Sequence, residues 1–213
     1  MTPAAKTQLL KRLAADVGFS AVGVTHAGPV ERARYYRQWL DAGYAGSTHY
    51  LARNVPLRAA PEKLLPGARS IICVAVSYKR AAETPPEAER SSGRCASYAR
   101  GWDYHVVIRQ MLEQLAAGLR RQLDDDFDYR VCVDTAPVLE RELAARAGLG
   151  WVGKNTCILN QELGSFLLLG ELVTTLELEP DKPVTDHCGR CTRCIDACPT
   201  NALVAPRQLD ASR

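Results

Sequence analysis

Four cysteines lie close together near the end of the chain, with the spacing Cys188-x2-Cys191-x2-Cys194-x3-Cys198-Pro199. Cysteine thiolates hold iron–sulfur clusters, and in bacterial ferredoxins this spacing gives three ligands to one cluster and the fourth to another. Zinc is the alternative metal, but its sites more often pair two CxxC motifs, or a CxxC motif and histidines, across a longer stretch. The run therefore predicts three ligands of one 4Fe–4S cluster and one ligand of a second.

The other cysteines have no such arrangement. None of Cys73, Cys95, Cys132 and Cys157 belongs to a CxxC pair, and two of them fall inside expected strands. A free cysteine in a strand is usually a small buried hydrophobe. We therefore expect these four not to bind a second set of irons, and we expect His187, beside the run, to be an ordinary loop residue.

Asp134 is a second residue that could do chemistry. It ends an expected strand over residues 129–134 and precedes an expected helix over 135–148, with Thr135 as the N-cap. A carboxyl group there can act as a general acid or can cap the helix. Burial favours the protonated acid, whereas the positive end of a helix favours the carboxylate. The residues alone leave both roles open and favour the cap.

A glycine-rich segment, GLGWVGKNT (148–156), carries Lys154 and Asn155. Glycine-rich turns can cradle phosphate groups, but the order of residues here is neither that of a P-loop nor that of a dinucleotide-binding turn. By itself the segment predicts either a phosphate site or a simple turn.

Helices and strands must position these residues. Apolar residues at helical spacing predict helices over 9–17, 30–46 and 103–123, and glycines end the first two. Apolar and β-branched runs predict strands over residues 19–26, 69–79, 129–134 and 165–179, the last as one long strand or a hairpin arm. Residues 80–93 are polar and rich in Pro and Ser, which predicts a surface loop, and 179–187 resembles a linker.

The composition is that of a globular protein. The chain has 213 residues, of which 46% are hydrophobic, and its net charge of +3 is too small to indicate a nucleic-acid binder by itself. No apolar run is long enough to span a bilayer, and the N-terminus lacks a secretory core. We therefore expect a cytoplasmic protein, in which the eight cysteines do not form structural disulfides and metal binding is the first interpretation of a cysteine cluster.

Three further stretches, taken with the cysteine run, closely resemble the epoxyqueuosine reductase family. They are SYARGWDYH (97–105), VDTAPVLERELAARAGLGWVGKNT (133–156) and GSFLLLGEL (164–172). The resemblance covers nearly the whole chain. It implies an enzyme of the cobalamin-dependent reductases, a group that includes the reductive dehalogenases, which reduces epoxyqueuosine to queuosine at the wobble position of certain tRNAs.

The resemblance also implies the fold and the cofactors. It predicts an α+β (α/β sandwich) cobalamin-binding reductase domain over residues 1–180 and an incomplete ferredoxin-like iron–sulfur segment over 181–213. In the family two 4Fe–4S clusters pass electrons to the cobalt of cobalamin. The expected partners are tRNA carrying epoxyqueuosine and a reduced flavodoxin or ferredoxin. We expect no association with a membrane, and we expect the chain to be a monomer.

The resemblance assigns roles to particular residues. It implies that Asp134 is the proton donor that helps to open the epoxide. It places the following residues at the cobalamin site: Arg58, Ser97, Tyr98, Arg100, Asp134, Lys154, Asn155, Thr156, Ile158, Ser165 and Leu169. Residues 97–100 could equally form a polar loop before a helix, with Tyr104 and His105 at the rim of the site, and Ile158 and Leu169 could be core strand residues.

The sequence departs from the family pattern at its end. In the family, further cysteines and a helical-repeat region follow the segment that here reads VAPRQLDASR (204–213). We therefore expect a truncated form with an incomplete ligand set. The alternatives are an iron–sulfur electron carrier without a substrate site, an inactive fragment that binds cobalamin or tRNA, and a cobalamin reductase for another small molecule.

Overall fold

The chain forms a four-stranded antiparallel sheet with helices on both faces. The computed structural model describes residues 1–79 and 95–213, so the expected loop over 80–93 lies outside the described residues. The sheet has the order β1–β2–β6–β3, and each neighbouring pair is antiparallel. The strands are β1 (Ala21–His26), β2 (Ser70–Ser77), β3 (Tyr129–Cys132) and β6 (Leu167–Thr174). The expected α+β mixture of helices and strands is confirmed, and the sheet is antiparallel.

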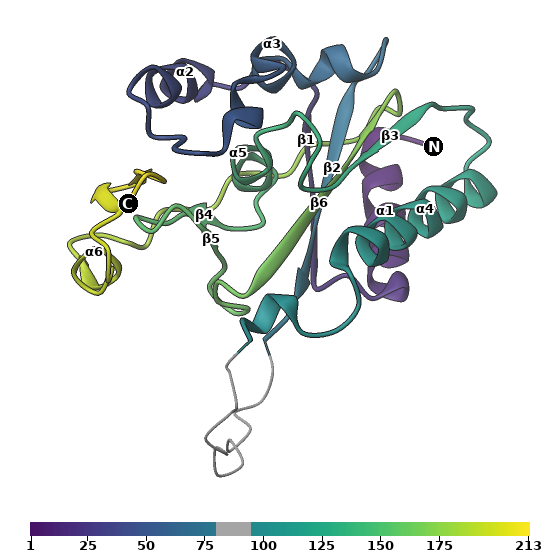
Figure 1. Ribbon diagram of the computed structural model, residues 1–213. Helices are drawn as coiled ribbons and strands as arrows, with labels where there is room; N and C mark the ends of the chain where they lie inside the picture. Colours follow the sequence, from purple (N-terminus) through teal and green to yellow (C-terminus); the bar gives the residue numbers. More distant parts are fainter. Residues whose placement is uncertain (80–94) are drawn as a thin grey trace.

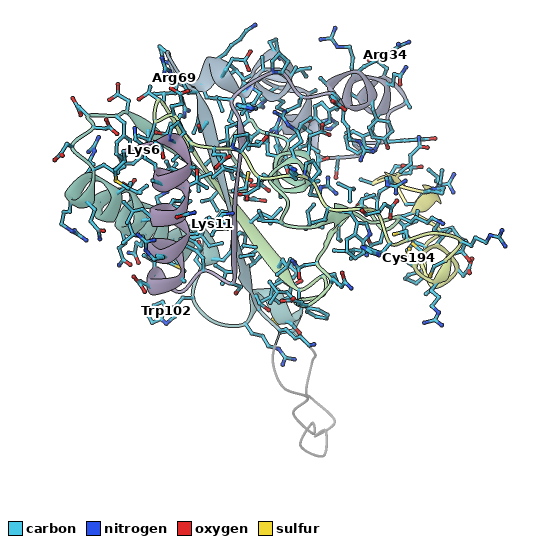
Figure 2. The ribbon with its side chains drawn as sticks, turned by 180° about the vertical axis from the view of Figure 1, so that it is seen from behind. Lys6, Lys11, Arg34, Arg69, Trp102 and Cys194 are labelled. Atoms are coloured by element: carbon cyan, nitrogen blue, oxygen red, sulfur yellow. The ribbon has the colours of Figure 1, made fainter. Side chains whose placement is uncertain are left out.

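Two helices cover one face of the sheet, and a short helix covers the other (Figure 1). α1 (Pro3–Val17) and α4 (Tyr104–Gln122) pack together on the first face, and α5 (Glu140–Arg146) lies on the second. The Thr2 hydroxyl accepts the Ala5 N–H at 3.2 Å at the start of α1. The ion pairs Lys6–Asp125 and Lys11–Asp181 hold the outer side of α1, where Figure 2 shows both lysines.

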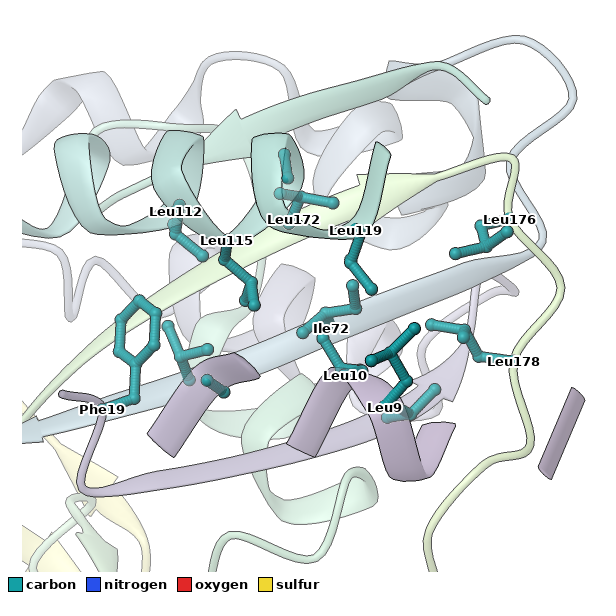
Figure 3. Packing of buried hydrophobic residues seen from close by; sticks show 14 of the residues in the cluster. Leu9, Leu10, Phe19, Ile72, Leu112, Leu115, Leu119, Leu172, Leu176 and Leu178 are labelled. Carbon is teal, nitrogen blue, oxygen red and sulfur yellow. The ribbon is translucent and has the colours of Figure 1, made fainter. Parts of the chain in front are cut away.

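The larger core lies between α1, α4 and the sheet. Figure 3 shows its leucine side chains interdigitating between the two helices and strands β2 and β6. Gly170 lets α4 approach β6 closely, because a Cβ at this position would lie 2.6 Å from Cγ2 of Ile108. Among the described residues, no helix is both long and apolar enough to cross a membrane.

This core sets the stability of the sheet that carries the site. Leu115 on α4 is fully buried, so Leu115→Ala should lower the free energy of unfolding by about 2–5 kcal/mol through lost burial and the cavity left behind. Val106→Ala, at a half-exposed position of the same helix, should change it by less than about 0.5 kcal/mol. Urea unfolding measures both, and similar values for the two variants would contradict this account of the core.

Two expected helices are shorter than the sequence pattern indicates. α2 spans Ala33–Asp41 rather than 30–46, and turns follow it. The helix expected over 135–148 is only α5, Glu140–Arg146. Residues 135–139 form turns and bends instead, so the expectation that Thr135 caps the helix is wrong.

Short elements complete the fold around α5. α3 (Val55–Ala59) follows α2, and the hairpin of β4 (Trp151–Val152) and β5 (Ile158–Leu159) follows α5. The chain ends with α6 (Arg193–Asp196) and the hairpin of β7 (Leu203–Ala205) and β8 (Gln208–Leu209). Three short 3-10 turns complete the described elements, at His49–Ala52, Pro61–Leu64 and Ser97–Ala99.

The C-terminal segment packs against α2 through hydrogen bonds. The Trp39 indole N–H donates to the Leu209 carbonyl at 2.6 Å, and the Tyr35 hydroxyl donates to the Arg207 carbonyl at 3.0 Å. The Ala211 N–H donates to the Tyr44 carbonyl at 2.8 Å. The chain's last hairpin therefore lies beside α2, to one side of the sheet (Figure 1).

Candidate active site

Several strands and helices begin or end at the end of the sheet where β2 and β3 terminate, which we call the sheet edge. Because β2 and β3 both run antiparallel to β6, they end toward the start of β6: the last residue of β2, Ser77, pairs with Leu167, and the last residue of β3, Cys132, pairs with Glu171. Asp134 lies two residues after the end of β3, and α4 begins at Tyr104 near the same place. This edge therefore gathers residues that are far apart in the sequence.

Asp134 is held in an unusual conformation at this edge. Its φ of 49° places it in the left-handed region, which non-glycine residues rarely adopt and which is often found at functional sites. Its backbone N–H donates to Oε1 of Glu140 at 2.6 Å, and its Oδ2 lies 3.1 Å from Nε2 of His105. The residue before α5 is Leu139, so the alternative that Asp134 caps this helix is wrong.

His105 and Tyr104 surround the Asp134 carboxyl group. Hydrogen bonds to Asp134 and then to Asp103 raise the pKa of His105 above its ordinary 6.5. Burial, together with the negative charge of Asp134, raises the pKa of Tyr104 to about 12. Asp134 thus lies beside His105, which can carry a positive charge, and beside Tyr104, which stays a neutral phenol. The expectation that both residues lie at the rim of the site agrees with these contacts.

The His105–Asp134 contact gives a testable pH dependence. We expect the pKa of His105 above 6.5, and Asp134→Asn should lower it further than Asp103→Asn does, because Asp134 is the larger cause. Since the folded pKa is raised, the contact stabilises the chain fully below pH 6.5 and loses that effect as the pH rises through the folded pKa. Imidazole NMR titration measures these values, and equal shifts in the two variants would contradict the assignment.

A cavity of about 280 Å³ opens beside Asp134. It lies between α2, the residues 134–142 and the C-terminal segment, and three residues of the expected site line it, namely Arg58, Asp134 and Thr156. Arg58 is buried and donates to the Val138 carbonyl at 3.2 Å, but its Nε has no hydrogen-bond partner among the described residues. A buried donor without a partner is costly, which makes this nitrogen a candidate ligand contact.

The remaining lining of the cavity combines aromatic, charged and aliphatic side chains. Tyr36 and Trp39 stack with ring centroids 6.0 Å apart, and the Arg58 guanidinium lies 6.0 Å from the centre of the Tyr36 ring. The lining residues are Arg32, Tyr35, Tyr36, Trp39, Tyr50, Leu51, Arg58, Asp134, Val138, Leu139, Glu140, Arg141, Glu142, Val152, Thr156, Arg207 and Leu209. Rings and guanidinium groups of this kind can stack on or hydrogen-bond a planar polar ligand.

The segment before α4 lies at the surface. Tyr98 and Arg100 are exposed and Ser97 is partly buried. The Arg100 Nε donates to the Cys95 carbonyl at 3.1 Å. Tyr98 and Phe166 both lie close to Tyr78, whose ring meets that of Phe166 edge to face at 5.3 Å. An exposed aromatic surface therefore adjoins the beginning of β6.

The glycine-rich segment after α5 contacts both the cysteine segment and α5. The Lys154 ammonium donates to the carbonyls of Gly189 and Cys191 at 2.8 and 2.9 Å, so it contacts the cysteine segment and does not line the cavity. Asn155 Oδ1 accepts the Cys157 N–H at 3.2 Å. Thr156 has a φ of 69°, and its carbonyl accepts from Arg141 at 2.7 Å.

The other expected cofactor residues are largely part of the sheet and hairpin. Ile158 on β5 is buried in the second core, which agrees with its alternative role as a core strand residue. Leu169 pairs with Ala75 across β6 and β2 and is partly buried against the same core. Ser165 precedes β6 and is partly buried. Leu169 and Ser165 lie at the edge of the sheet that carries Asp134.

The cysteine run occupies the projecting segment that contains α6, far from α1 and α4; Figure 2 marks Cys194 there. All four cysteines are free and partly or fully accessible. The Trp151 indole N–H donates to the Cys188 sulfur at 3.4 Å, and the Trp151 ring packs on His187 at 5.0 Å. An ion pair between Arg207 and Asp186 also holds this segment.

The thiols of the run suit metal binding chemically. Backbone N–H groups, that of Leu203 first and those of Thr200 and Ala202 after it, lower the pKa of Cys198 and so favour the thiolate that binds metal. Within residues 1–79 and 95–213, no three His, Cys, Asp or Glu side chains are grouped closely enough to hold a metal ion. The ligand set of the four cysteines stays a prediction.

Sequence reasoning missed Glu140 and Glu171. Glu140 holds the Asp134 N–H, and Glu171 on β6 is fully buried between Cys73 and Cys132 of the neighbouring strands. A signal for Glu171 was present, because it is the only charged residue in the apolar run SFLLLGELVTTL (165–176). No local pattern marked Glu140.

Comparisons with known proteins agree with this geometry. Residues 58–135 match the family model "Epoxyqueuosine reductase QueG, DUF1730", and residues 187–213 match that of a "4Fe-4S double cluster binding domain". An epoxyqueuosine reductase of Xanthomonas campestris is 42% identical over 207 residues, which cover 96% of this chain and 58% of that protein. The chain is a relative of the epoxyqueuosine reductases. It spans 54 to 63% of the length of the curated relatives compared here.

Solved structures of epoxyqueuosine reductases have the same fold. That from Streptococcus thermophilus has a TM-score of 0.90 at 34% identity, covering 97% of this chain and 56% of that one. One solved with an epoxyqueuosine-modified tRNA-Tyr stem loop has a TM-score of 0.88 at 35% identity, covering 98% and 56%. The resemblance to epoxyqueuosine reductases and the 4Fe–4S character of the C-terminal segment are thereby confirmed.

Two further structures bear on the site. One epoxyqueuosine reductase from Bacillus subtilis, with a TM-score of 0.79 at 32% identity, has a catalytic aspartate loop swung out of its active site; the match covers 98% of this chain and 56% of that one. A reductive dehalogenase with a TM-score of 0.57 at 20% identity, covering 98% and 24%, shares the fold alone.

Proposed function

We propose that this chain reduces epoxyqueuosine in tRNA to queuosine, with cobalamin at the sheet edge and electrons entering through the C-terminal 4Fe–4S segment. The observation that carries the proposal is Asp134, held in a left-handed conformation at the mouth of a cavity lined by arginines and aromatic rings. The similarity to epoxyqueuosine reductases over 96% of the chain supports it. We place this activity in the cytoplasm and in a monomer.

The residues at the sheet edge fit cobalamin better as a surface ligand than as an enclosed one. The cavity of about 280 Å³ lies at the small end of ligand pockets. It suits a nucleobase-sized group, and the much larger corrin would lie against the exposed surface near Tyr98 and Phe166. The residues that would hold cobalamin are those named from the sequence: Arg58, Ser97, Tyr98, Arg100, Asp134, Lys154, Asn155, Thr156, Ile158, Ser165 and Leu169.

Removing the epoxide oxygen as water consumes two electrons and two protons. Bound cobalamin supplies a reducible cobalt for the electrons. Asp134 donates a proton to the departing oxygen, and His105, 3.1 Å from its carboxylate, stabilises the negative charge that remains. The neutral Tyr104 beside it adds no charge. The arginines and rings of the cavity hold the modified nucleoside in place.

The cysteine segment serves as the route for electrons. Lys154 fixes this segment to the turn before β5, and Arg207 contributes both to the cavity lining and to the ion pair with Asp186. A reduced flavodoxin or ferredoxin would donate at the exposed side of α6, where Cys194 lies (Figure 2).

Anaerobic reconstitution of the chain with iron, sulfide and cobalamin tests the proposal. We expect about one cobalt per chain and, with a low-potential chemical reductant and an epoxyqueuosine-modified stem loop, conversion to queuosine detected by mass spectrometry. The affinity for the stem loop should fall as salt rises. Iron without cobalt would favour the electron carrier, and cobalt without conversion would favour an inactive binding fragment; either result would overturn the proposal.

A further inference from the structure

Behind Asp134 lies a carboxyl group for which the proposed reaction has no role. Glu171 is fully buried, and on its face of the sheet its neighbours are Cys73 on β2 and Cys132 on β3. Neither of its carboxyl oxygens has a hydrogen-bond partner among the described residues. Ionising a carboxyl group there would leave an uncompensated buried charge. Burial raises the pKa of Glu171 well above its ordinary value, so this side chain is a neutral acid.

A second carboxyl group stands between Glu171 and the cavity. Glu140 begins α5, lines the cavity, and accepts the Asp134 N–H at 2.6 Å through its Oε1. Burial first, and then the negative charge of Asp134, raises the pKa of Glu140 to about 7, against the opposing effects of the Asp134 N–H, Arg141 and Arg58. Glu140 in turn raises the pKa of Glu171, so the two groups compete for negative charge.

We propose that Glu140 and Glu171 form a buried pair with a single negative charge, carried by Glu140, which holds the backbone of Asp134 at the cavity. Glu140 is a positioning residue in this account, because it acts through Asp134. The neutral Glu171 lets Glu140 stay ionised, since a second charge in the same low-dielectric region would be strongly unfavourable. The functional meaning of the pair rests on the proposed role of Asp134.

The strength of the hydrogen bond from the Asp134 N–H to Glu140 depends on the charge of Glu140. A carboxylate accepts an N–H more strongly than a neutral carboxyl group does. When Glu140 takes up a proton, its hydrogen bond with the Asp134 N–H weakens. The left-handed conformation of Asp134 then loses the hydrogen bond that stabilises it. Asp134, Arg141 and Arg58 act on Glu140, and the charge of Glu140 acts in turn on Tyr104, Cys73 and Cys132. Arg146, Arg130 and Arg109 lie further out and act on the two thiols, and His105 contacts Asp134.

The backbone amide of Asp134 reports on the pair directly. In 15N-labelled chain, without cobalamin or tRNA, we expect its NMR resonance to titrate with a midpoint near 7, following Glu140. In Glu140→Gln the amide should lose the step that follows Glu140 and keep only the step of the His105 imidazole, which the titration of that ring identifies. Its protection from hydrogen exchange at pH 8 should fall by about tenfold, as a charged acceptor becomes a neutral one. An Asp134 amide that titrates alike in both proteins would overturn the proposal.

Glu171→Gln is the matched control, because a glutamine reproduces the shape of a neutral acid. We expect the Asp134 amide to titrate in this variant as it does in the natural chain. Infrared spectra should show the C=O band of a protonated carboxyl group at pH 8 in the natural chain, and the band should disappear in Glu171→Gln. Absence of that band from the natural chain, which needs no variant to fold, would refute the neutral Glu171.

These measurements are separate from turnover. If the amide and infrared results hold and Asp134→Asn retains full activity, the pair exists but the proposed role of Asp134 fails. If Asp134→Asn is inactive and the Asp134 amide does not respond to Glu140, the proposed reaction stands and the pair is rejected. If both hold, Glu140→Gln should lower kcat about tenfold and flatten its pH profile near 7.

Discussion

Asp134→Asn lowers the rate of queuosine formation by roughly 10²–10⁴-fold, because an amide cannot donate the proton that the departing oxygen needs. Asparagine has nearly the shape of aspartate, and it also tolerates the left-handed conformation found at this position. We therefore expect the variant to fold and to bind cobalamin as the natural chain does. The measurement is turnover of a modified stem loop under a chemical reductant, beside a cobalt count per chain.

Asp103→Asn provides the matched comparison for this experiment. Asp103 contacts the same His105 at 2.7 Å from the opposite ring nitrogen, but it does not line the cavity. The Asp103–His105 ion pair is exposed, so its loss in Asp103→Asn should change the rate of queuosine formation by less than about fivefold. A variant at Asp134 that keeps full turnover, or equal losses at the two positions, would show that the acid is another group.

Cys194→Ser removes most of the iron bound after anaerobic reconstitution, since a serine hydroxyl is a poor replacement for a cluster thiolate. Cys157→Ser is the control, because Cys157 is also an exposed free thiol but lies outside the run. It should leave the iron content unchanged. Iron and sulfide per chain are counted chemically, and the visible absorption of the cluster gives an independent reading.

Iron unchanged from the natural chain in both variants would mean that the run is not the iron site. The same loss in both would place Cys157 among the ligands, against the expectation that it and the other isolated cysteines do not bind iron. Cys73 and Cys132 are buried, and burial raises the pKa of both thiols, which disfavours the thiolates that iron requires.

Local sequence pattern was sufficient for the sheet and poor at the site. The run from Ser70 to Ser77 is apolar and β-branched, and it is β2 in the structure. The expected strand over 165–179 is β6, shorter than expected and central, because it pairs with both β2 and β3. Such runs are recognisable since burial on both faces leaves few polar residues in them.

The loop after β3 shows why the arrangement of the site could not be predicted from local sequence pattern. The sequence after Asp134 has helical spacing, but Glu140 bonds the Asp134 N–H and α5 begins only there. That outcome depends on a buried environment supplied by residues such as Arg58 and Glu171, far away in the sequence. Lys154 likewise joins the cysteine segment through carbonyls 35 and 37 residues away, which no local motif indicates.

The hydrogen bonds between α2 and the last hairpin have a consequence for how quickly the cavity forms. They join residues separated by 170 and 172 positions, from Trp39 to Leu209 and from Tyr35 to Arg207. Contacts at such separation form late, because the chain must first lose the entropy of closing a very long loop. The cavity, which Arg207 and Leu209 help to line, is therefore complete only once the last hairpin has docked on α2.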